Sequence, residues 1–178
     1  HPFDGPLTLQ GSATLGLEIV EYLKLINTKI DNLLISVGGG GLISGVSSYV
    51  KQFYPKIKII GVEPENANGL NQSFRANKPL NNINVNSIAD SLSAPLHMQY
   101  SFDVAKEVID DMVTVSDDQM KKFMVFCYKK FKLFLEPACV AGLAALKYKI
   151  NNKLIGKNTM VILCGSNIDK KTWSDLTN

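Results

Sequence analysis

The chain has 178 residues, of which 46% are hydrophobic and 20% charged, so it is long enough for one α/β domain of ordinary globular balance. No apolar run approaches the roughly 18 residues that a membrane span needs, and the net charge of +3 comes from lysines, with Arg75 as the only arginine. Because nucleic-acid surfaces depend on arginine for bidentate contacts, we expect neither a membrane nor a nucleic acid as a partner.

Cysteine and histidine usage argues against several kinds of site. Cys127, Cys139 and Cys164 are widely spaced and match no metal-binding pattern, and their odd number indicates a reducing compartment, so we expect a cytoplasmic protein. The chain has only two histidines, His1 and His97, so it offers few ligands for a zinc centre and few candidates for the base of a serine–histidine triad.

The amino-terminal part predicts a turn, a strand and a helix. Segment 2–6 contains two prolines and a glycine and predicts a turn, and Leu7–Gln10 has the pattern of an apolar strand. A helix is expected over about 13–26. Its apolar stripe comprises Leu15, Ile19, Leu23 and Ile26. A chain that starts within such a connection has the character of a fragment, so we expect an incomplete single domain over 1–178.

The rest of the chain alternates strands with helices. Strands are expected at 33–37, 57–62, 112–115 and 160–163. Helices are expected at about 42–53, 66–75 and 100–110, after Ser116, and from Pro137. Ser116 and Gln119 have the spacing of a capping box. The inward side chains of the helix after Ser116 are expected to be Met120, Phe123, Met124, Cys127, Phe131 and Phe134. The small residues after Pro137 predict a thin helix face that can pack closely on a sheet.

Four consecutive glycines, Gly38–Gly41, join an apolar strand to a helix. Glycine admits positive φ and close approach of a ligand to the backbone, and a helix N-terminus adds unpaired N–H donors and a positive dipole end. This combination predicts a phosphate cradle. Neither of two common phosphate motifs is complete, because no lysine follows until Lys51 and G-x-G-x-x-G is not formed. A flexible turn is the alternative, which the strand–loop–helix context disfavours.

Apolar strands that alternate with helices predict an α/β fold with a mostly parallel sheet and helices on both faces. In such sheets, ligands bind beyond the carboxyl ends of the strands. The glycine loop and segment 164–167 both follow expected strands. The residues alone therefore predict a phosphate-bearing small molecule bound at one edge of the sheet.

Several motifs, in order, resemble one enzyme family. They are Val37–Leu42 with Ser44-Gly45, Gly61–Glu65, Ile88–Asp90, Glu136–Ala138 and Leu163–Asp169, together with His1–Asp4 and Thr14–Glu18. This set resembles the fold-type II pyridoxal-phosphate enzymes, which share the fold of the tryptophan synthase β subunit, and within them the threonine dehydratase and serine racemase group. The resemblance covers nearly the whole chain.

The resemblance implies a role for each matching residue. Gly38, Gly39, Gly40, Gly41 and Leu42 would offer N–H groups to the phosphate of pyridoxal phosphate. Cys164 stands where the family has a Ser or Cys that faces the pyridine nitrogen, and it could instead be a small hydrophobic residue at a strand end. Glu136 would approach the ring, or it is a plain acid at a helix start. The implied substrate is a small amino acid, and the full-length protein is expected to be a homo-oligomer.

Some family members also bind a divalent cation, and here the pattern is incomplete. The matching positions are Glu63, the carbonyl of Ala67, and Gly69, so the third ligand, a carboxylate, is missing. We therefore expect the site to be weakened or absent and Glu63 to be a hydrogen-bonded strand-end residue. Ala13 and Ser91 replace family glycines, which is expected to alter loop geometry near the cofactor.

The family's Schiff-base lysine has no counterpart in this chain. None of the lysines lies in the Ser-x-Lys-x-Arg-Gly context. The resemblance places that lysine upstream of His1, so we expect this chain alone to be inactive. Three functions follow as hypotheses: a threonine or serine ammonia-lyase, an amino-acid racemase of the same group, and a non-catalytic domain that binds phosphate ligands or partners.

Overall fold

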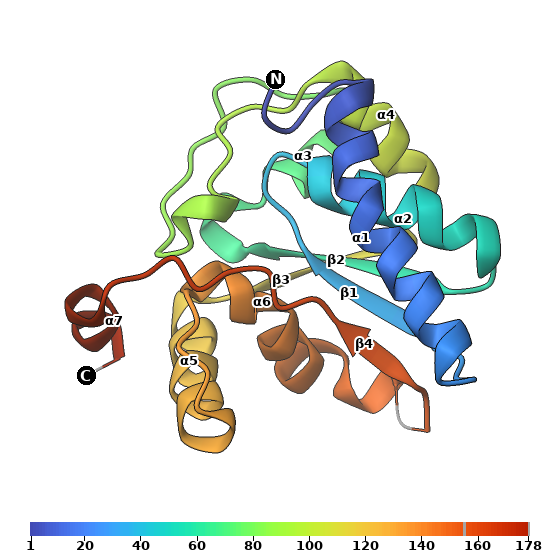
Figure 1. Ribbon diagram of the computed structural model, residues 1–178. Coiled ribbons are helices and arrows are strands. Elements are labelled where there is room, and N and C mark those ends of the chain that lie inside the picture. Colours follow the sequence, from blue (N-terminus) through green and yellow to red (C-terminus); the bar gives the residue numbers. More distant parts are fainter. Residues whose placement is uncertain (155, 178) are drawn as a thin grey trace.

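The computed structural model describes residues 1–154 and 156–177 and places a β-sheet between two layers of helices (Figure 1). Within these residues the strands are β1 (Asn32–Ser36), β2 (Lys58–Pro64), β3 (Asp111–Val115) and β4 (Thr159–Val161). All neighbouring strands are parallel and lie in the order β3-β2-β1-β4. The predicted parallel α/β sheet is therefore confirmed.

The helices cover both faces of this sheet (Figure 1). One layer contains α1 (Pro6–Leu25), α2 (Gly41–Phe53), α3 (Gly69–Ala76) and α4 (Gln99–Val108). The other contains α5 (Asp117–Phe131) and α6 (Pro137–Ala145), with α7 (Lys170–Thr177) beside α5. Short 3₁₀ turns lie at Glu65–Ala67, Asp90–Leu92 and Asn151–Lys153, and a π-helical turn spans Leu146–Ile150. None of the helices among the described residues is long and apolar enough to cross a membrane.

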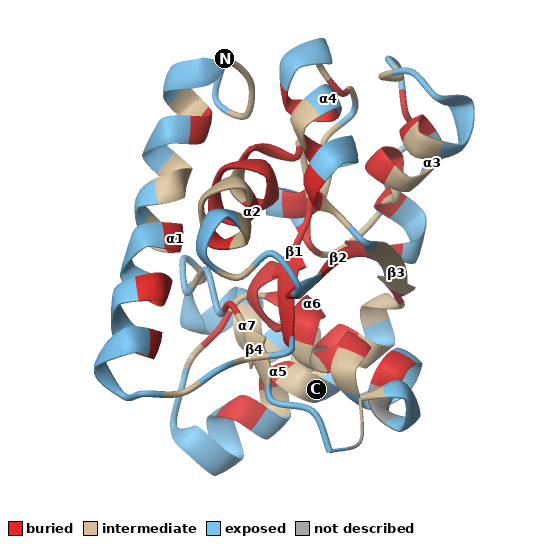
Figure 2. Ribbon diagram, turned by 90° about the vertical axis from the view of Figure 1, so that its right-hand side faces the viewer, coloured by how far each residue is buried: buried red, intermediate tan, exposed pale blue. Residues whose placement is uncertain are grey.

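The side chains of β1 alternate between two hydrophobic cores. Leu33 and Ile35 pack with the layer that contains α1 and α2, whereas Leu34 packs with α5 and α6. All five residues of β1 are buried, as expected for a central parallel strand covered on both faces (Figure 2). The strand that leads directly into the glycine loop is thus buried at the centre of the molecule.

The small residues of α6 let it lie close to the sheet, as predicted. A Cβ atom added at Gly142 would lie 2.6 Å from Cγ1 of Val161 in β4. Eight of the nine residues of α6 are buried. Because Glu136 immediately precedes this helix, the close packing also fixes the position of Glu136 relative to the sheet.

The capping box at the start of α5 is confirmed, but the inward stripe is shorter than predicted. The Gln119 N–H donates to Oγ of Ser116, and the Ser116 N–H donates to Oε1 of Gln119. Met120, Met124 and Cys127 are buried, whereas Phe131 is 54% exposed. Phe134 lies beyond the helix and stacks on Trp173 of α7. The helix ends at Phe131 because Lys132 adopts a left-handed backbone conformation.

The strand predicted at Leu7–Gln10 is wrong, because α1 already begins at Pro6. Proline at the first helical position is preorganised for a helix, and Leu7 is 80% exposed, unlike a residue in a buried strand. Three boundaries also differ. Ile26 follows α1 and is exposed, and the helix predicted at 66–75 is divided into a 3₁₀ turn and α3. The last strand ends at Val161, two residues earlier than expected.

Candidate active site

The strand order creates a crevice beyond the carboxyl ends of β1 and β4. From β1 the chain adds β2 and then β3 on one side, and β4 pairs with the opposite side of β1. Parallel sheets bind ligands where the strand order reverses in this way. A cavity of about 560 Å³ lies there, lined by the glycine loop, by Ser36 at the end of β1 and by Cys164 after β4.

The glycine loop presents unpaired backbone donors to this cavity. Gly40 is the N-cap of α2 with φ of 92°, a left-handed conformation that glycine adopts without strain. Within the described residues, the N–H groups of Gly39, Gly40, Gly41 and Leu42 donate to no protein acceptor. The first turn of a helix leaves such groups free, and the helix dipole adds a positive end. A phosphate group fits this donor set.

Close packing behind the loop explains why it is built from glycine. A Cβ atom at Gly39 would lie 2.1 Å from Cγ of Phe3, inside the space that the aromatic ring occupies. At Gly38 a Cβ atom would lie 3.0 Å from the carbonyl oxygen of Ser91. Phe3 also lines the cavity and makes an edge contact with His1. The amino-terminal segment therefore leaves no room for a side chain at Gly39, and the segment that contains Ser91 crowds Gly38.

Cys164 follows β4 by three residues and lines the same cavity as Ser36 at the end of β1. The Ser36 hydroxyl donates to the carbonyl oxygen of Ala138 at 2.9 Å. Loss of solvent raises the pKa of the Cys164 thiol, and the nearby Glu136 carboxylate raises it further. At neutral pH the thiol therefore keeps its proton. A weak, uncharged hydrogen-bonding group faces this part of the cavity.

Glu136 joins two loops at the rim of the same cavity. Its Oε1 accepts a hydrogen bond from Oγ of Ser91 at 3.2 Å, and its N–H donates to the carbonyl oxygen of Gly165 at 3.5 Å. A Cβ atom at Gly165 would lie 2.3 Å from Oε1 of Glu136, so glycine is needed there for the carboxylate to fit. Ser91, predicted only as a disturbance of loop geometry, is thus the side-chain partner of Glu136.

The structure brings the residues predicted for the cofactor into one place. Gly38, Gly39, Gly40, Gly41, Leu42, Glu136 and Cys164 all line the one cavity. What each does to a bound cofactor stays a prediction. Sequence reasoning missed Phe3, Ser36 and the buried His97. A hydroxyl at the end of a buried strand was the available signal for Ser36, and an imidazole within an apolar loop was the signal for His97.

The candidate cation residues lie elsewhere and have other partners. Both carboxyl oxygens of Glu63 accept backbone hydrogen bonds, from Leu70 at 2.7 Å and from Asn71 at 3.0 Å. Burial raises the pKa of Glu63 to about 8, although these two N–H groups act in the opposite direction. Ala67 is buried, and Gly69 faces the ring of His97 rather than supplying a ligand.

These residues do not fit a divalent cation. No group of three or more His, Cys, Asp or Glu side chains in the described part of the chain could hold a metal ion. Glu63 instead is a hydrogen-bonded residue at the end of β2, the alternative that the sequence favours. Its carboxyl group satisfies two donors in the first turn of α3.

A cradle of free N–H groups at the switch point of a parallel sheet is the arrangement in which α/β proteins hold phosphate-bearing small molecules. A model of the family described as "pyridoxal-phosphate dependent enzyme" matches residues 1–165. The chain therefore belongs to the pyridoxal-phosphate dependent enzymes, and its fold is that of fold-type II.

Individual relatives agree with this assignment. The chain is 41% identical to phenylserine dehydratase of Ralstonia pickettii over 174 residues, which are 98% of this chain and 52% of the relative. Its fold matches the processed form of threonine deaminase isoform 2 from Solanum lycopersicum with a TM-score of 0.91 and 34% identity, covering 99% of this chain and 51% of the other. For maize serine racemase the TM-score is 0.88 at 31% identity, with 99% and 54% covered. The chain thus spans about half the length of the relatives it matches.

Proposed function

We propose that the protein is a pyridoxal-phosphate dependent ammonia-lyase that converts a β-hydroxy amino acid, such as threonine or serine, into a 2-oxo acid and ammonia. The observation that carries the proposal is the glycine loop, whose free N–H groups at the start of α2 line the same cavity as a neutral Cys164. Similarity to proteins named phenylserine dehydratase and threonine deaminase supports this reaction class.

The residues of this chain would bind and orient the cofactor. The N–H groups of Gly39, Gly40, Gly41 and Leu42 would hold the phosphate, and Phe3 would close the loop from behind. When bound, the pyridoxal group draws electrons away from the amino acid's α-carbon. The hydrogen bond from Ser91 to Glu136 would keep that carboxylate at the rim.

Cys164 would limit how far electrons are withdrawn. We propose that its side chain faces the ring nitrogen, as in the family that the chain resembles, and the raised pKa keeps the thiol neutral. A thiol that holds its own proton leaves the neighbouring nitrogen largely unprotonated. Such an environment favours rapid loss of a β-hydroxyl group over reactions that need a long-lived carbanion.

The lysine that binds the cofactor covalently is proposed to lie outside these 178 residues. Among the described residues no lysine lines the cavity, and none is buried. A covalent anchor that also moves the α-proton must reach the cavity. We therefore propose that this chain by itself does not turn over substrate.

The activity test uses the protein expressed from its complete reading frame and loaded with pyridoxal phosphate. Threonine, serine and phenylserine are each supplied, and the 2-oxo acid and ammonia are quantified. We expect equimolar 2-oxobutanoate and ammonia from threonine. Binding of the cofactor without 2-oxo acid from any of the three amino acids would overturn the ammonia-lyase proposal.

A racemase is the second candidate, favoured by the similarity to maize serine racemase. It is distinguished in the same experiment by chiral analysis. D-serine that accumulates from L-serine without net ammonia would identify a racemase. A protein that fails to bind pyridoxal phosphate at all would instead be the non-catalytic domain.

A further inference from the structure

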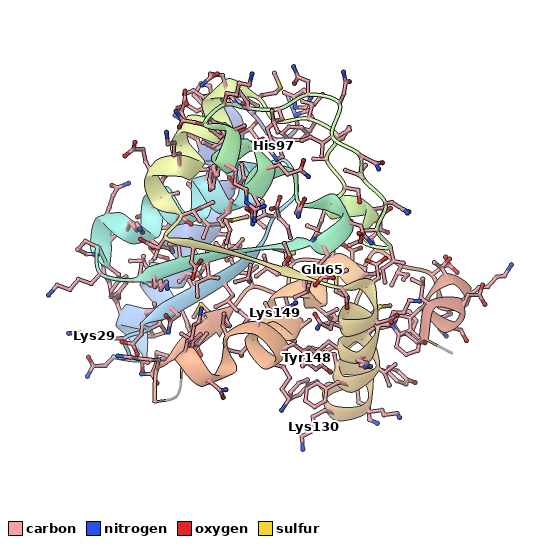
Figure 3. The ribbon with its side chains drawn as sticks, turned by 180° about the vertical axis from the view of Figure 1, so that it is seen from behind. Lys29, Glu65, His97, Lys130, Tyr148 and Lys149 are labelled. Carbon is pink, nitrogen blue, oxygen red and sulfur yellow. The ribbon has the colours of Figure 1, made fainter. Side chains whose placement is uncertain are left out.

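His97 is a buried imidazole that the proposed chemistry does not use. It lies on the segment between the Asp90–Leu92 turn and α4, and only 3% of its surface is exposed (Figure 3). Its Nε2 lies 3.1 Å from the carbonyl oxygen of Gly38, the first glycine of the loop. Its Nδ1 lies 3.4 Å from Oγ of Ser73 in α3.

The partners of the ring fix its tautomer. A carbonyl oxygen can only accept, so Nε2 carries the proton and donates to Gly38. Nδ1 then has a lone pair and accepts from the Ser73 hydroxyl, whose oxygen in turn accepts from the Leu80 N–H at 3.2 Å. Burial lowers the pKa of His97, in keeping with a neutral ring. A continuous chain of hydrogen bonds therefore runs from Leu80 to the glycine loop.

The ring of His97 occupies the space beside Gly69. A Cβ atom at Gly69 would lie 2.7 Å from Cε1 of His97 and 2.7 Å from Cδ1 of Ile83. A side chain at position 69 and the imidazole at position 97 therefore exclude each other. Position 69 would have to carry the third cation ligand, but it has no side chain. The imidazole of His97 occupies the space that such a side chain would need.

The other end of the loop is held in a similar way. Oγ of Ser12 in α1 lies 2.9 Å from the carbonyl oxygen of Gly41, and it also approaches the carbonyl oxygens of Thr8 and Leu9. The carbonyl groups of the first and last glycines thus have side-chain donors from outside the loop. A peptide plane whose carbonyl oxygen is held cannot rotate freely, so the N–H group on its opposite side is oriented as well.

We infer that His97 is a positioning residue that holds the Gly38 carbonyl and thereby orients the N–H groups of the glycine loop toward the cofactor phosphate, without a metal ion. The inference rests on the proposed function for the identity of the ligand. It assigns the Ser73–His97–Gly38 hydrogen bonds to phosphate affinity rather than to the overall stability of the fold.

The experiment compares two substitutions of His97 in the protein expressed from its complete reading frame. His97→Leu keeps an apolar side chain in the space but has no donor, whereas His97→Gln retains an amide N–H that can reach the Gly38 carbonyl. The equilibrium affinities for pyridoxal phosphate and for pyridoxal, which lacks the phosphate, are measured by absorbance titration. We expect His97→Leu to weaken binding of pyridoxal phosphate by about tenfold with little change for pyridoxal, and His97→Gln to restore most of the loss.

A second readout does not depend on the cofactor. Nitrogen NMR of the imidazole should show the Nε2–H tautomer in the unsubstituted protein, and amide order parameters at Gly39 and Gly40 should fall in His97→Leu and recover in His97→Gln. An equal loss of affinity for both ligands, or unchanged order parameters, would overturn the inference. If order parameters respond as expected but the unsubstituted protein shows no preference for pyridoxal phosphate over pyridoxal, the proposed cofactor is wrong and His97 still holds the loop.

Discussion

Cys164 differs from the other cysteines in both exposure and surroundings. Cys127 and Cys139 are buried, whereas Cys164 is exposed at the edge of the cavity. Partial desolvation raises the pKa of its thiol, and the nearby Glu136 carboxylate acts in the same direction. Because only the thiolate reacts quickly with alkylating reagents, Cys164 should be accessible but slow at neutral pH.

Iodoacetamide labelling across a pH series tests this property. We expect Cys164 to be the modified cysteine in the folded protein, with a rate at neutral pH below that of an ordinary free thiol and a steep rise above pH 9, the usual thiol value. Pyridoxal phosphate should protect it. Labelling faster than a free thiol at neutral pH would show an activated thiolate instead.

At the scale of single residues, the sequence was sufficient to predict the cavity-lining residues that belong to a recognisable motif. The glycines, Leu42, Glu136 and Cys164 line the predicted cavity because each lies within a few residues of a strand end or a helix start. Phe3 and His97 could not be predicted in this way. Their contacts with Gly39 and Gly38 come from segments distant in sequence, and no periodic pattern reports such contacts.

Glu63 connects two elements, the end of β2 and the first turn of α3. Its carboxyl oxygens satisfy the N–H groups of Leu70 and Asn71, which have no partner within the helix. We expect Glu63→Gln to lower the free energy of unfolding by about 1–3 kcal/mol, because the amide can accept only one of these bonds. Urea denaturation measures the effect.

Glu65, two residues further on, is the matched control. It forms an exposed ion pair with Lys149 at 3.0 Å (Figure 3). Glu65→Gln should therefore cost less than about 1 kcal/mol. Added Mg²⁺ should raise the unfolding midpoint of neither the parent protein nor the two variants. A midpoint that rises with Mg²⁺ in the parent protein and not in Glu63→Gln would show that Glu63 binds the cation after all.

At the scale of elements, local pattern predicted most helices and strands and failed where two signals competed. Leu7–Gln10 has the apolar content of a strand, but Pro6 and the later buried positions of α1 continue one helical face. Leu9, Gly16, Val20 and Leu23 lie on that face. The missed signal was therefore Pro6, which was assigned to a turn although proline is also favoured at the start of a helix.

At the scale of the whole molecule, the alternating pattern predicted a parallel sheet but not the order of its strands. The pairing of β4 with β1 joins residues about 127 positions apart, such as Asn32 and Thr159. That pairing creates the switch point, and the switch point places Cys164 opposite the glycine loop. The sequence pattern already placed both segments at the ligand-binding edge of the sheet, and the family resemblance added the prediction that they contact the same cofactor.

The cavity holds donors for a phosphate and no amine for an aldehyde, which leads to a prediction for the complete protein. All the lysines of this chain are exposed or half-buried, and several form surface ion pairs, as Lys51 does with Asp110 and Lys58 with Asp111. We therefore expect borohydride reduction of the cofactor-loaded protein, followed by peptide mass spectrometry, to locate the labelled lysine outside residues 1–178. Labelling should reach one cofactor per chain and should fall when inorganic phosphate competes for the glycine loop. Surface lysines would be labelled only in small amounts, and as readily by pyridoxal as by its phosphate. Stoichiometric, phosphate-sensitive labelling of a lysine within these residues would instead mean that the chain closes over its own cavity in a conformation different from the one described.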